Sequence, residues 1–173
     1  MRFQQLFTIT LAATAAATPL ADKIYQLNDV INGLEQSLAN WQGSYVGMIT
    51  ILMPTLSANV QALMLTSDIT NTAQSAGTLS EADADNVLAA LEESNNGRPT
   101  IEQTVIQKQG AFVALDKGWG DVIQVYAGVI GHLATEAQTA IKNALPADRQ
   151  AQVQEILDAG QNSLAEIRST YAS

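Results

Sequence analysis

Hydrophobic residues recur at helical spacing along almost the whole chain. Between Ile24 and Trp41 the apolar positions are separated by alternating steps of three and four residues, with polar side chains between them. This spacing places the apolar side chains on one face of an amphipathic helix. No stretch shows the strict alternation of apolar and polar residues that predicts a half-buried strand. The pattern therefore predicts an all-α fold.

The stretch from Trp41 to Ser67 contains no charged residue and is apolar around most of its circumference. One helical stripe of this stretch is formed by Val46, Ile49, Met53, Leu56, Val60 and Leu63. A helix that is apolar nearly all round must be covered by other helices, a bilayer or an apolar ligand. Its three methionines suit an irregular or changing contact, because an unbranched thioether fills uneven gaps. We expect this stretch to form the central wall of a helical bundle that accepts apolar guests.

Residues with special backbone preferences divide the pattern into helices. Gly43 and Ser44 separate the first two, and Pro54 is expected to kink the second helix or divide it in two. Overlapping capping boxes in residues 78–83 predict the start of a third helix. The sequence Asn95-Asn96-Gly97 predicts its end.

The second half of the chain is divided in the same way. Pro99 fits the start of a fourth helix, and residues 118–120, Gly-Trp-Gly, suggest a hinge before a fifth. Pro146 ends the fifth helix, and a sixth carries apolar residues as far as Tyr171. The predicted fold is an up-and-down bundle of five to six antiparallel helices joined by short loops.

The first 17 residues have the features of a secretory signal peptide. Arg2 is the only charged residue before Asp22, and a short apolar run ends in the small residues 15–17. The run is too short to span a bilayer. Polar residues also interrupt every window of about 20 residues in the uncharged stretch, so no transmembrane segment is expected. We therefore expect a secreted protein whose residues 18–173 form one helical domain.

Composition narrows the functional classes. The 173 residues carry a formal net charge of −9, which argues against binding nucleic acid or anionic membranes through charge. The absence of cysteine excludes disulfides, thiolate metal sites and a cysteine nucleophile. No nucleophile elbow, phosphate-binding loop or dinucleotide fingerprint occurs. The sequence therefore predicts a protein that is not an enzyme and needs no cofactor.

Two polar features resemble metal sites without meeting their requirements. Glu81, Asp83 and Asp85 follow the spacing of a calcium loop, but its sixth position is Asn86 instead of glycine. Acidic residues are also favoured in a first helical turn by the helix dipole alone. His132 has no cysteine or second histidine to complete a zinc site. We expect it to lie at the rim of its helix.

An apolar ligand would lie against the uncharged stretch and the two helices predicted after Pro99. The candidate lining residues are Ile49, Leu52, Met53, Leu56, Val60, Phe112, Leu115, Val125 and Val129. Lys108, Tyr126 and His132 are candidates for holding a carboxylate head group. The chain has only two Trp, three Phe and four Tyr, and a bundle with few large aromatic side chains is able to leave a lined void between its helices.

The order of these features resembles that of a known family. A signal peptide precedes an acidic, cysteine-free helical domain that carries Lys108-x-x-x-Phe112, Val122, Val125 and Leu133, then Leu145-Pro146 and a last helix ending at Tyr171. In this, the chain resembles the hydrophobic surface-binding protein A family, which includes fungal cell-wall galactomannoproteins. The resemblance covers roughly residues 24–171.

The resemblance implies a secreted, cell-wall-associated helical bundle that adsorbs to hydrophobic surfaces and recruits a cutinase- or esterase-type hydrolase. For the galactomannoprotein branch it also implies a fatty acid enclosed between the helices. The sequence lacks the Ser/Thr-rich stalk and anchoring tail of wall-anchored members. Two alternatives stay open, a structural or antigenic wall mannoprotein and a helical regulator of a secreted enzyme. Plant-type invertase inhibitors, which are helical regulators of secreted enzymes, use disulfides, which this chain cannot form.

Overall fold

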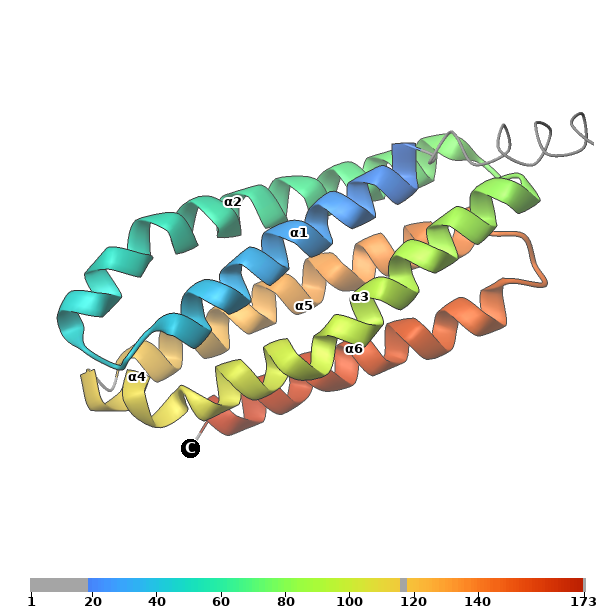
Figure 1. Ribbon diagram of the computed structural model, residues 1–173. Helices are drawn as coiled ribbons and strands as arrows, with labels where there is room; N and C mark the ends of the chain where they lie inside the picture. Colours follow the sequence, from blue (N-terminus) through green and yellow to red (C-terminus); the bar gives the residue numbers. More distant parts are fainter. Residues whose placement is uncertain (1–18, 116–117, 173) are drawn as a thin grey trace, which may run out of the picture.

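The computed structural model describes residues 19–115 and 118–172. The backbone of this part is helical, and the prediction of an all-α bundle is confirmed. Short connections join six helices, five long and one short, and no strand occurs within the described ranges (Figure 1). The helices are α1 (Pro19–Asn40), α2 (Tyr45–Ala76), α3 (Glu81–Gln107), α4 (Gln109–Leu115), α5 (Gly118–Ala144) and α6 (Gln150–Tyr171).

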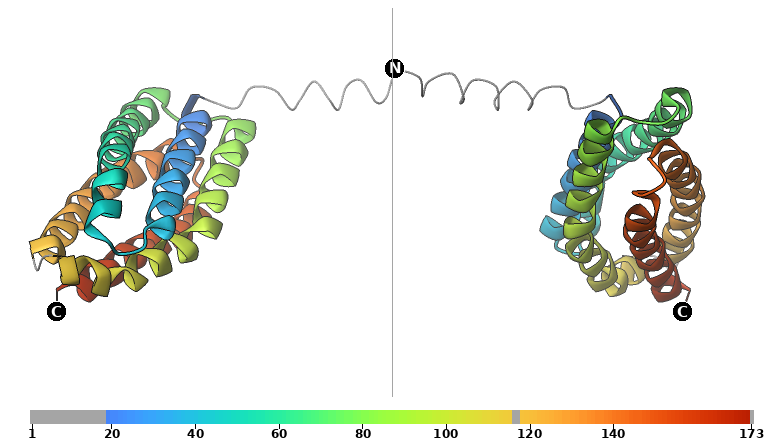
Figure 2. Two further views of the ribbon diagram at one scale, coloured as in Figure 1. Left: turned by 60° about the vertical axis from the view of Figure 1, so that its left-hand side comes forward. Right: turned by 90° about the vertical axis from the view of Figure 1, so that its right-hand side faces the viewer.

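The five long helices form a closed ring, in which each packs mainly against two neighbours in the cyclic order α1, α2, α5, α6, α3. The long helices alternate in direction along the chain, as predicted (Figure 1). An odd number of helices cannot alternate all the way round a ring, so some spatial neighbours are parallel. The parallel neighbours are α2 with α5, α3 with α6, and α1 with α3 (Figure 2).

Helix α2 begins as predicted. It continues past Pro54, where a division into two helices was one of the expected outcomes. Ser44 caps it, with its side-chain oxygen accepting a hydrogen bond from the Gly47 N–H at 3.0 Å. Gly43 before it has a φ of 76°, a conformation that favours glycine. The helix is not divided at Pro54. Packing against α1 on one side and α5 on the other keeps the helix continuous and outweighs the local preference of proline.

Helix α3 contradicts the predicted break at Asn95–Gly97 and the predicted helix start at Pro99, because it runs through both. Contacts with α1 on both sides of the expected break explain the continuity. Asn28 donates to the Ala90 carbonyl at 3.1 Å, and Thr104 donates to Glu35 at 2.8 Å. The break falls instead at Lys108, whose N–H donates to Thr104 and Ile106 carbonyls.

Gly118 and Gly120 lie at the start of α5, just after the end of α4. Helix α4 ends at Leu115 and α5 begins at Gly118, so Gly118–Gly120 form the first turn of α5. The change of helix is as predicted. Movement about this point stays a prediction.

The acidic run at the start of α3 has a structural role. Ser80 caps the helix by accepting from the Asp83 N–H at 3.2 Å, as predicted. Arg149, which precedes α6, lies 3.6 Å from the Glu81 carboxylate and 3.1 Å from that of Asp85. The run therefore ties the start of α6 to α3. No group of three potential metal ligands occurs among the described residues.

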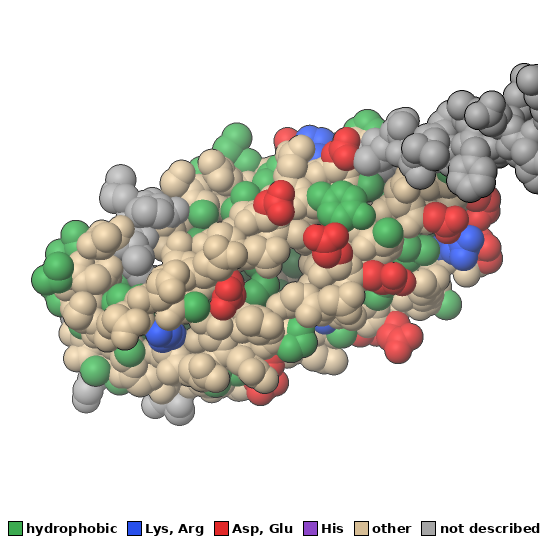
Figure 3. Space-filling model, viewed as in Figure 1, with side chains coloured by type: hydrophobic (Ala, Val, Ile, Leu, Met, Phe, Trp, Pro, Cys, Tyr) green, Lys and Arg blue, Asp and Glu red, His purple; other side chains and the backbone are tan. Residues whose placement is uncertain are grey.

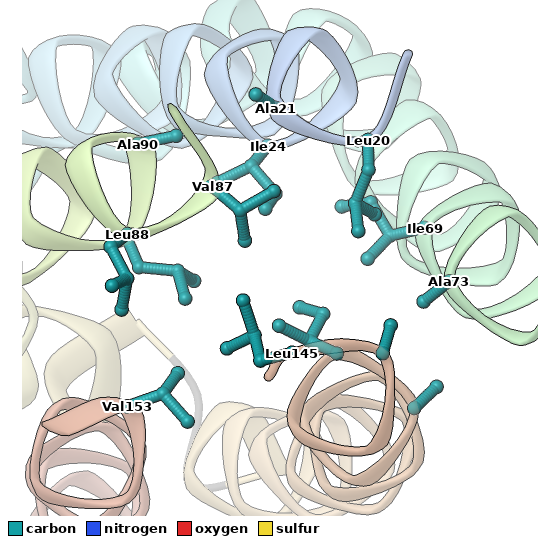
Figure 4. Close-up of a cluster of buried hydrophobic side chains, with 14 of the residues drawn as sticks. Leu20, Ala21, Ile24, Ile69, Ala73, Val87, Leu88, Ala90, Leu145 and Val153 are labelled. Atoms are coloured by element: carbon teal, nitrogen blue, oxygen red, sulfur yellow. The ribbon is translucent and has the colours of Figure 1, made fainter. Parts of the chain in front are cut away.

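The core consists of two clusters at opposite ends of the ring. In Figure 4, side chains from all five long helices point to a common centre at one end, where Leu145 and Val153 are 1% and 0% exposed. The other end holds Trp41, Met48, Phe112 and Tyr171. There the rings of Trp41 and Phe112 lie 4.7 Å apart between centroids. Both ends are closed by well-packed side chains.

Candidate functional site

The hydrophobic core is interrupted halfway along the bundle. We call this part the mid-section and define it as residues 28–37, 49–68, 92–104, 124–136 and 158–166. None of its described residues belongs to either end cluster. Its described side chains that are fully buried are all small: Asn28, Ala62, Ala127 and Ser163. Among the side chains that the structure describes, the large buried ones therefore lie at the two ends of the ring, and the buried ones of the middle are small.

The inner face of the mid-section follows from the heptad spacing of the helices. Residues seven apart share a helix face, and each long helix has a mid-section residue seven positions from a member of an end cluster. These inner residues are Ile31, Ala62, Arg98, Ile130 and Leu164. For α1, α3, α5 and α6 the same residue is flanked in this way on both sides. This inner face thus carries aliphatic side chains and one arginine, with the buried polar residues Asn28 and Ser163 in the same mid-section.

The larger inner aliphatic side chains, Ile31, Ile130 and Leu164, are only partly buried, although their spacing places them on the inner face. Protein interiors normally pack to the density of organic crystals, so partial exposure on an inner face indicates space beside the side chain. Figure 3 shows a small hollow between α1 and α3 near the middle of the molecule, with hydrophobic atoms below the surrounding polar ones. The interruption of the core therefore reaches toward the surface between these helices.

Arg98 provides a positive charge on this inner face. Its Nη2 donates to the Ile156 carbonyl at 3.4 Å and lies beside Gly160, where an added Cβ would be 3.8 Å away. Desolvation by burial lowers the pKa of the Arg98 guanidinium, and the charge of Glu102 opposes that shift. Because an arginine stays charged even when its pKa falls, Arg98 is a partly desolvated cation suited to an anionic group.

A polar contact between α3 and α6 lies next to Arg98. The buried Ser163 hydroxyl donates to Glu102 Oε2. A side-chain hydrogen bond with Glu102, followed by the charge of Glu102 and slight desolvation, raises the pKa of Glu166. Two carboxyl groups this close favour sharing a proton. Because of this contact, the interface between α3 and α6, called here the α3–α6 seam, is the polar side of the mid-section.

The structure separates the predicted lining residues into two groups. Phe112 is buried and Leu115 partly buried in the end cluster that contains Trp41. Five others lie on the outer surface and are between 47% and 66% exposed: Ile49, Leu56, Val60, Val125 and Val129. The side chains of Leu52 and Met53 lie outside the described residues. The apolar stripe of α2 thus faces outward in the closed bundle, without any opening of a hinge.

The predicted head-group residues are placed differently from one another. Lys108 Nζ donates to the carbonyls of Ala39 at 3.2 Å and Trp41 at 2.5 Å, so it satisfies carbonyls at the end of α1. His132 is exposed, as predicted for a rim residue, and its Nε2 lies 3.6 Å from Glu136 Oε1. The side chain of Tyr126 lies outside the described residues. Arg98, the inner cation, was not predicted from the sequence.

The signal for Arg98 was present but was obscured by an incorrect helix boundary. With α3 broken at Gly97, Arg98 would lie in a loop. With α3 continuous, Arg98 falls seven residues after Leu91 and seven before Val105, both of them in the core clusters. A heptad count carried through the Gly97–Pro99 region would have placed it on the inner face.

Several solved structures that contain fatty acids are similar to this chain in fold. The protein AfMP4p in complex with palmitic acid has a TM-score of 0.80 at 14% identity, over 90% of this chain and 99% of that one. Ligand binding domain 1 of Penicillium marneffei MP1, complexed with arachidonic acids, has a TM-score of 0.77 at 11% identity, over 90% and 99%. Domain 2 of MP1, complexed with multiple arachidonic acids, has a TM-score of 0.78 at 14% identity, over 92% and 99%.

At these identities the likeness is one of fold. No family model matches the sequence, and no curated protein matches it. Across the described residues, no helix combines the length and the hydropathy that crossing a membrane requires. The chain therefore shares the fold of these structures, which were solved with fatty acids bound.

Proposed function

We propose that this protein is a non-catalytic lipid carrier that takes a fatty acid into the mid-section of its helical ring. The observation that carries the proposal is the interruption of the core between two closed ends. A plain structural bundle gains stability from a continuous core, and leaving the middle unfilled forfeits it. An apolar guest restores the missing contacts.

The dimensions of the mid-section suit a long alkyl chain. Along α5, Ile123 and Ala137 belong to opposite clusters, and 14 residues of helix span roughly 21 Å at 1.5 Å per residue. A lipid tail occupies about half of a hydrocarbon layer that is roughly 30 Å thick. Burial of a 16-carbon tail contributes at most about 12 kcal/mol before ordering costs. Apolar lining alone is enough for tight binding.

Arg98 would hold the carboxylate. It carries the positive charge on the inner face, and hydrogen bonds between an arginine and a carboxylate are among the strongest in proteins. The protein as a whole is negatively charged, so an entering fatty-acid anion meets an unfavourable field elsewhere. A single inner cation then fixes the orientation of the ligand, with its tail running along Ile31, Ile130 and Leu164.

The broader setting follows from the sequence and the outer surface. The first 17 residues support secretion, and the resemblance to the hydrophobic surface-binding protein A family supports a place at the cell wall. The exposed aliphatic stripe of α2 favours adsorption to hydrophobic surfaces, since exposed apolar patches mark interaction sites. Recruitment of a secreted hydrolase to such a surface is the partner function that the family resemblance suggests.

The experiment compares one substitution at two alanines. Ala62 lies on the inner face of the mid-section and Ala84 in a packed end cluster, and both are buried. Ala62→Phe should fill the space, keep the melting temperature near that of the wild type, and abolish the palmitate adduct in native mass spectrometry. Ala84→Phe should cost about 1–3 kcal/mol by overpacking.

Two outcomes contradict the proposal. Destabilisation of Ala62→Phe as large as that of Ala84→Phe would mean that the mid-section is already filled. A folded Ala62→Phe protein that still carries palmitate would place the lipid elsewhere.

A further inference from the structure

An open groove runs along the outside of the ring between the parallel helices α2 and α5. Its described part lies between the C-terminal halves of the two helices and has a volume of about 720 Å³. It lies on the outside of the ring, whereas the site proposed above for a fatty acid is on the inner face of the same helices. It is lined by Thr70, Ala73, Gln74, Gly77, Thr78, His132, Thr135, Glu136, Thr139, Ala140, Asn143 and Ala144. Hydroxyl and amide groups therefore lie beside alanines in this groove, and no lysine or arginine is among these residues.

The same helix faces become aliphatic toward their N-termini. On α2, Leu56, Leu63 and Thr70 follow at intervals of seven residues and so share one face. Leu56 is 50% exposed and Leu63 is partly buried. On α5, Val125 and Val129 precede His132 and Glu136 by seven residues each, and the two valines are 66% and 47% exposed. Each helix thus presents an aliphatic half and then a polar half along one face.

The change from aliphatic to polar residues falls at the same level along the bundle axis in α2 and in α5. Because α2 and α5 are parallel neighbours (Figures 1 and 2), moving seven residues back along both from the polar groove leads from Thr70 to Leu63 and from Glu136 to Val129. The aliphatic halves are therefore adjacent, as the polar halves are. Together they form one strip that is apolar at one end and hydrogen-bonding at the other. We call it the α2–α5 strip.

We propose that the α2–α5 strip binds a second lipid, a single-chain amphiphile with an uncharged, hydroxylated head group such as a monoacylglycerol. The tail would lie on Leu56, Val125 and Val129, where exposed aliphatic side chains gain most from being covered. The hydroxyl groups of the head would exchange hydrogen bonds with Gln74 and Asn143 of the polar half. They would donate to Thr70 and Thr139, whose own hydroxyls already donate to backbone carbonyls of their helices. This site does not depend on the interior one.

The charges of the strip exclude a fatty acid. A carboxylate at its polar end would lie near Glu136, whose carboxylate is 3.6 Å from the His132 imidazole. The nearest lysine along α5, Lys142, donates to Gln154 of α6 at 2.6 Å and so points to a different neighbour. Like charges without a paired cation repel. An uncharged head group meets no such opposition, so the two sites would select different lipids.

The single histidine of the chain makes a site-specific test possible. Titration of the labelled full protein with monopalmitoylglycerol, at concentrations below micelle formation, should shift the imidazole resonances of His132 to saturation. Palmitate should leave them in place. The same response is expected from the interior-filled variant Ala62→Phe, which distinguishes failure of this proposal from failure of the interior one.

Matched variants locate the tail. Val129→Asp and Leu56→Asp are changes at exposed positions and should weaken monopalmitoylglycerol binding about tenfold. Met64→Asp is the control, because Met64 is 65% exposed but lies in the groove between α1 and α2. Its affinity should equal that of the wild type. Glu136→Lys should reverse the selectivity, so that palmitate shifts His132.

Three results would overturn the assignment. His132 resonances that do not move with monopalmitoylglycerol leave the strip without this ligand. Equal losses for Met64→Asp and Val129→Asp would indicate nonspecific binding. Self-association of the ligand-free protein that Val129→Asp abolishes would show instead that a second copy covers the strip.

Discussion

The ends and the middle of the ring are built from the same five helices, yet their side chains are packed differently. At the ends, Leu20, Leu145 and Val153 are at most 1% exposed, and the rings of Trp41 and Phe112 pack at a tilt with their centroids 4.7 Å apart. In the mid-section the buried described side chains are small, and the inner face includes a charged residue. The ends specify the fold, and the middle leaves room within it.

The difference shows how an all-helical chain combines a stable fold with a middle in which the buried described side chains are small. Core packing at two ends fixes the helices in direction and register, so the middle need not be filled for the ring to hold. An unfilled middle lowers the free energy of unfolding, and the packing of the two end clusters offsets this loss. The proposed ligand-binding middle therefore requires a bundle long enough to have two packed ends.

The largest expected effect contrasts truncations at an end and in the middle. Leu145→Ala removes a fully buried side chain from an end cluster and should cost about 2–5 kcal/mol. Leu164→Ala, on the partly buried inner face, should cost about 1 kcal/mol or less because little packing is lost. Urea unfolding of both variants measures the contrast. Equal costs would remove the distinction between the two regions.

The next effect tests the inner cation. Arg98→Met should weaken palmitate binding by about 1.5–3 kcal/mol, the usual range for a hydrogen bond to a charged group. Binding of hexadecanol, which has the same tail without the charge, should change little. Isothermal titration with both ligands separates these outcomes. Lys108→Met is the control, and equal losses of palmitate affinity in the two variants would argue against Arg98 as the anchor.

A smaller effect concerns the end cluster that contains Tyr171. The Tyr171 hydroxyl donates to the Val105 carbonyl at 2.8 Å, and burial raises the pKa of this tyrosine. Tyr171→Phe should cost about 0.5–1.5 kcal/mol. Tyr45→Phe, at a position 67% exposed, is the control and should be neutral. Thermal melts of both give the comparison, and a neutral Tyr171→Phe would deny the hydrogen bond a role in closing this end.

The smallest effect is a pH dependence of the polar seam between α3 and α6. Since the pKa of Glu166 is raised above its unfolded value, the folded state favours the protonated form, and stability falls as the pH rises through the folded pKa. Glu166→Gln should therefore raise the melting temperature at about pH 7 and lose this advantage near pH 4. Glu155→Gln on the same helix should show no such crossover. An advantage for Glu166→Gln that is independent of pH would refute the carboxyl pair.

Local patterns were enough to predict most of the helices. The Ser44 and Ser80 caps and the turn at Pro146 follow from short-range preferences that the tertiary structure leaves unchanged. The prediction failed where tertiary contacts oppose local signals. Asn95–Gly97 and Pro99 signal a helix end and a helix start, but packing on α1 at Ala90 and Thr104 keeps α3 continuous. The candidate cation Arg98 was missed for the same reason.

The sequence by itself determined the all-helical class, the up-and-down course and the apolar stripes on each helix, because each depends on residues within a few turns of one another. Only the tertiary structure decided which way the stripes face. The stripe of α2 at Ile49, Leu56 and Val60 faces outward, because closure of a five-membered ring turns another face of α2, with Met48, Ala62, Ile69 and Ala73, into the interior. The inner arginine and the α2–α5 strip exist only through that closure.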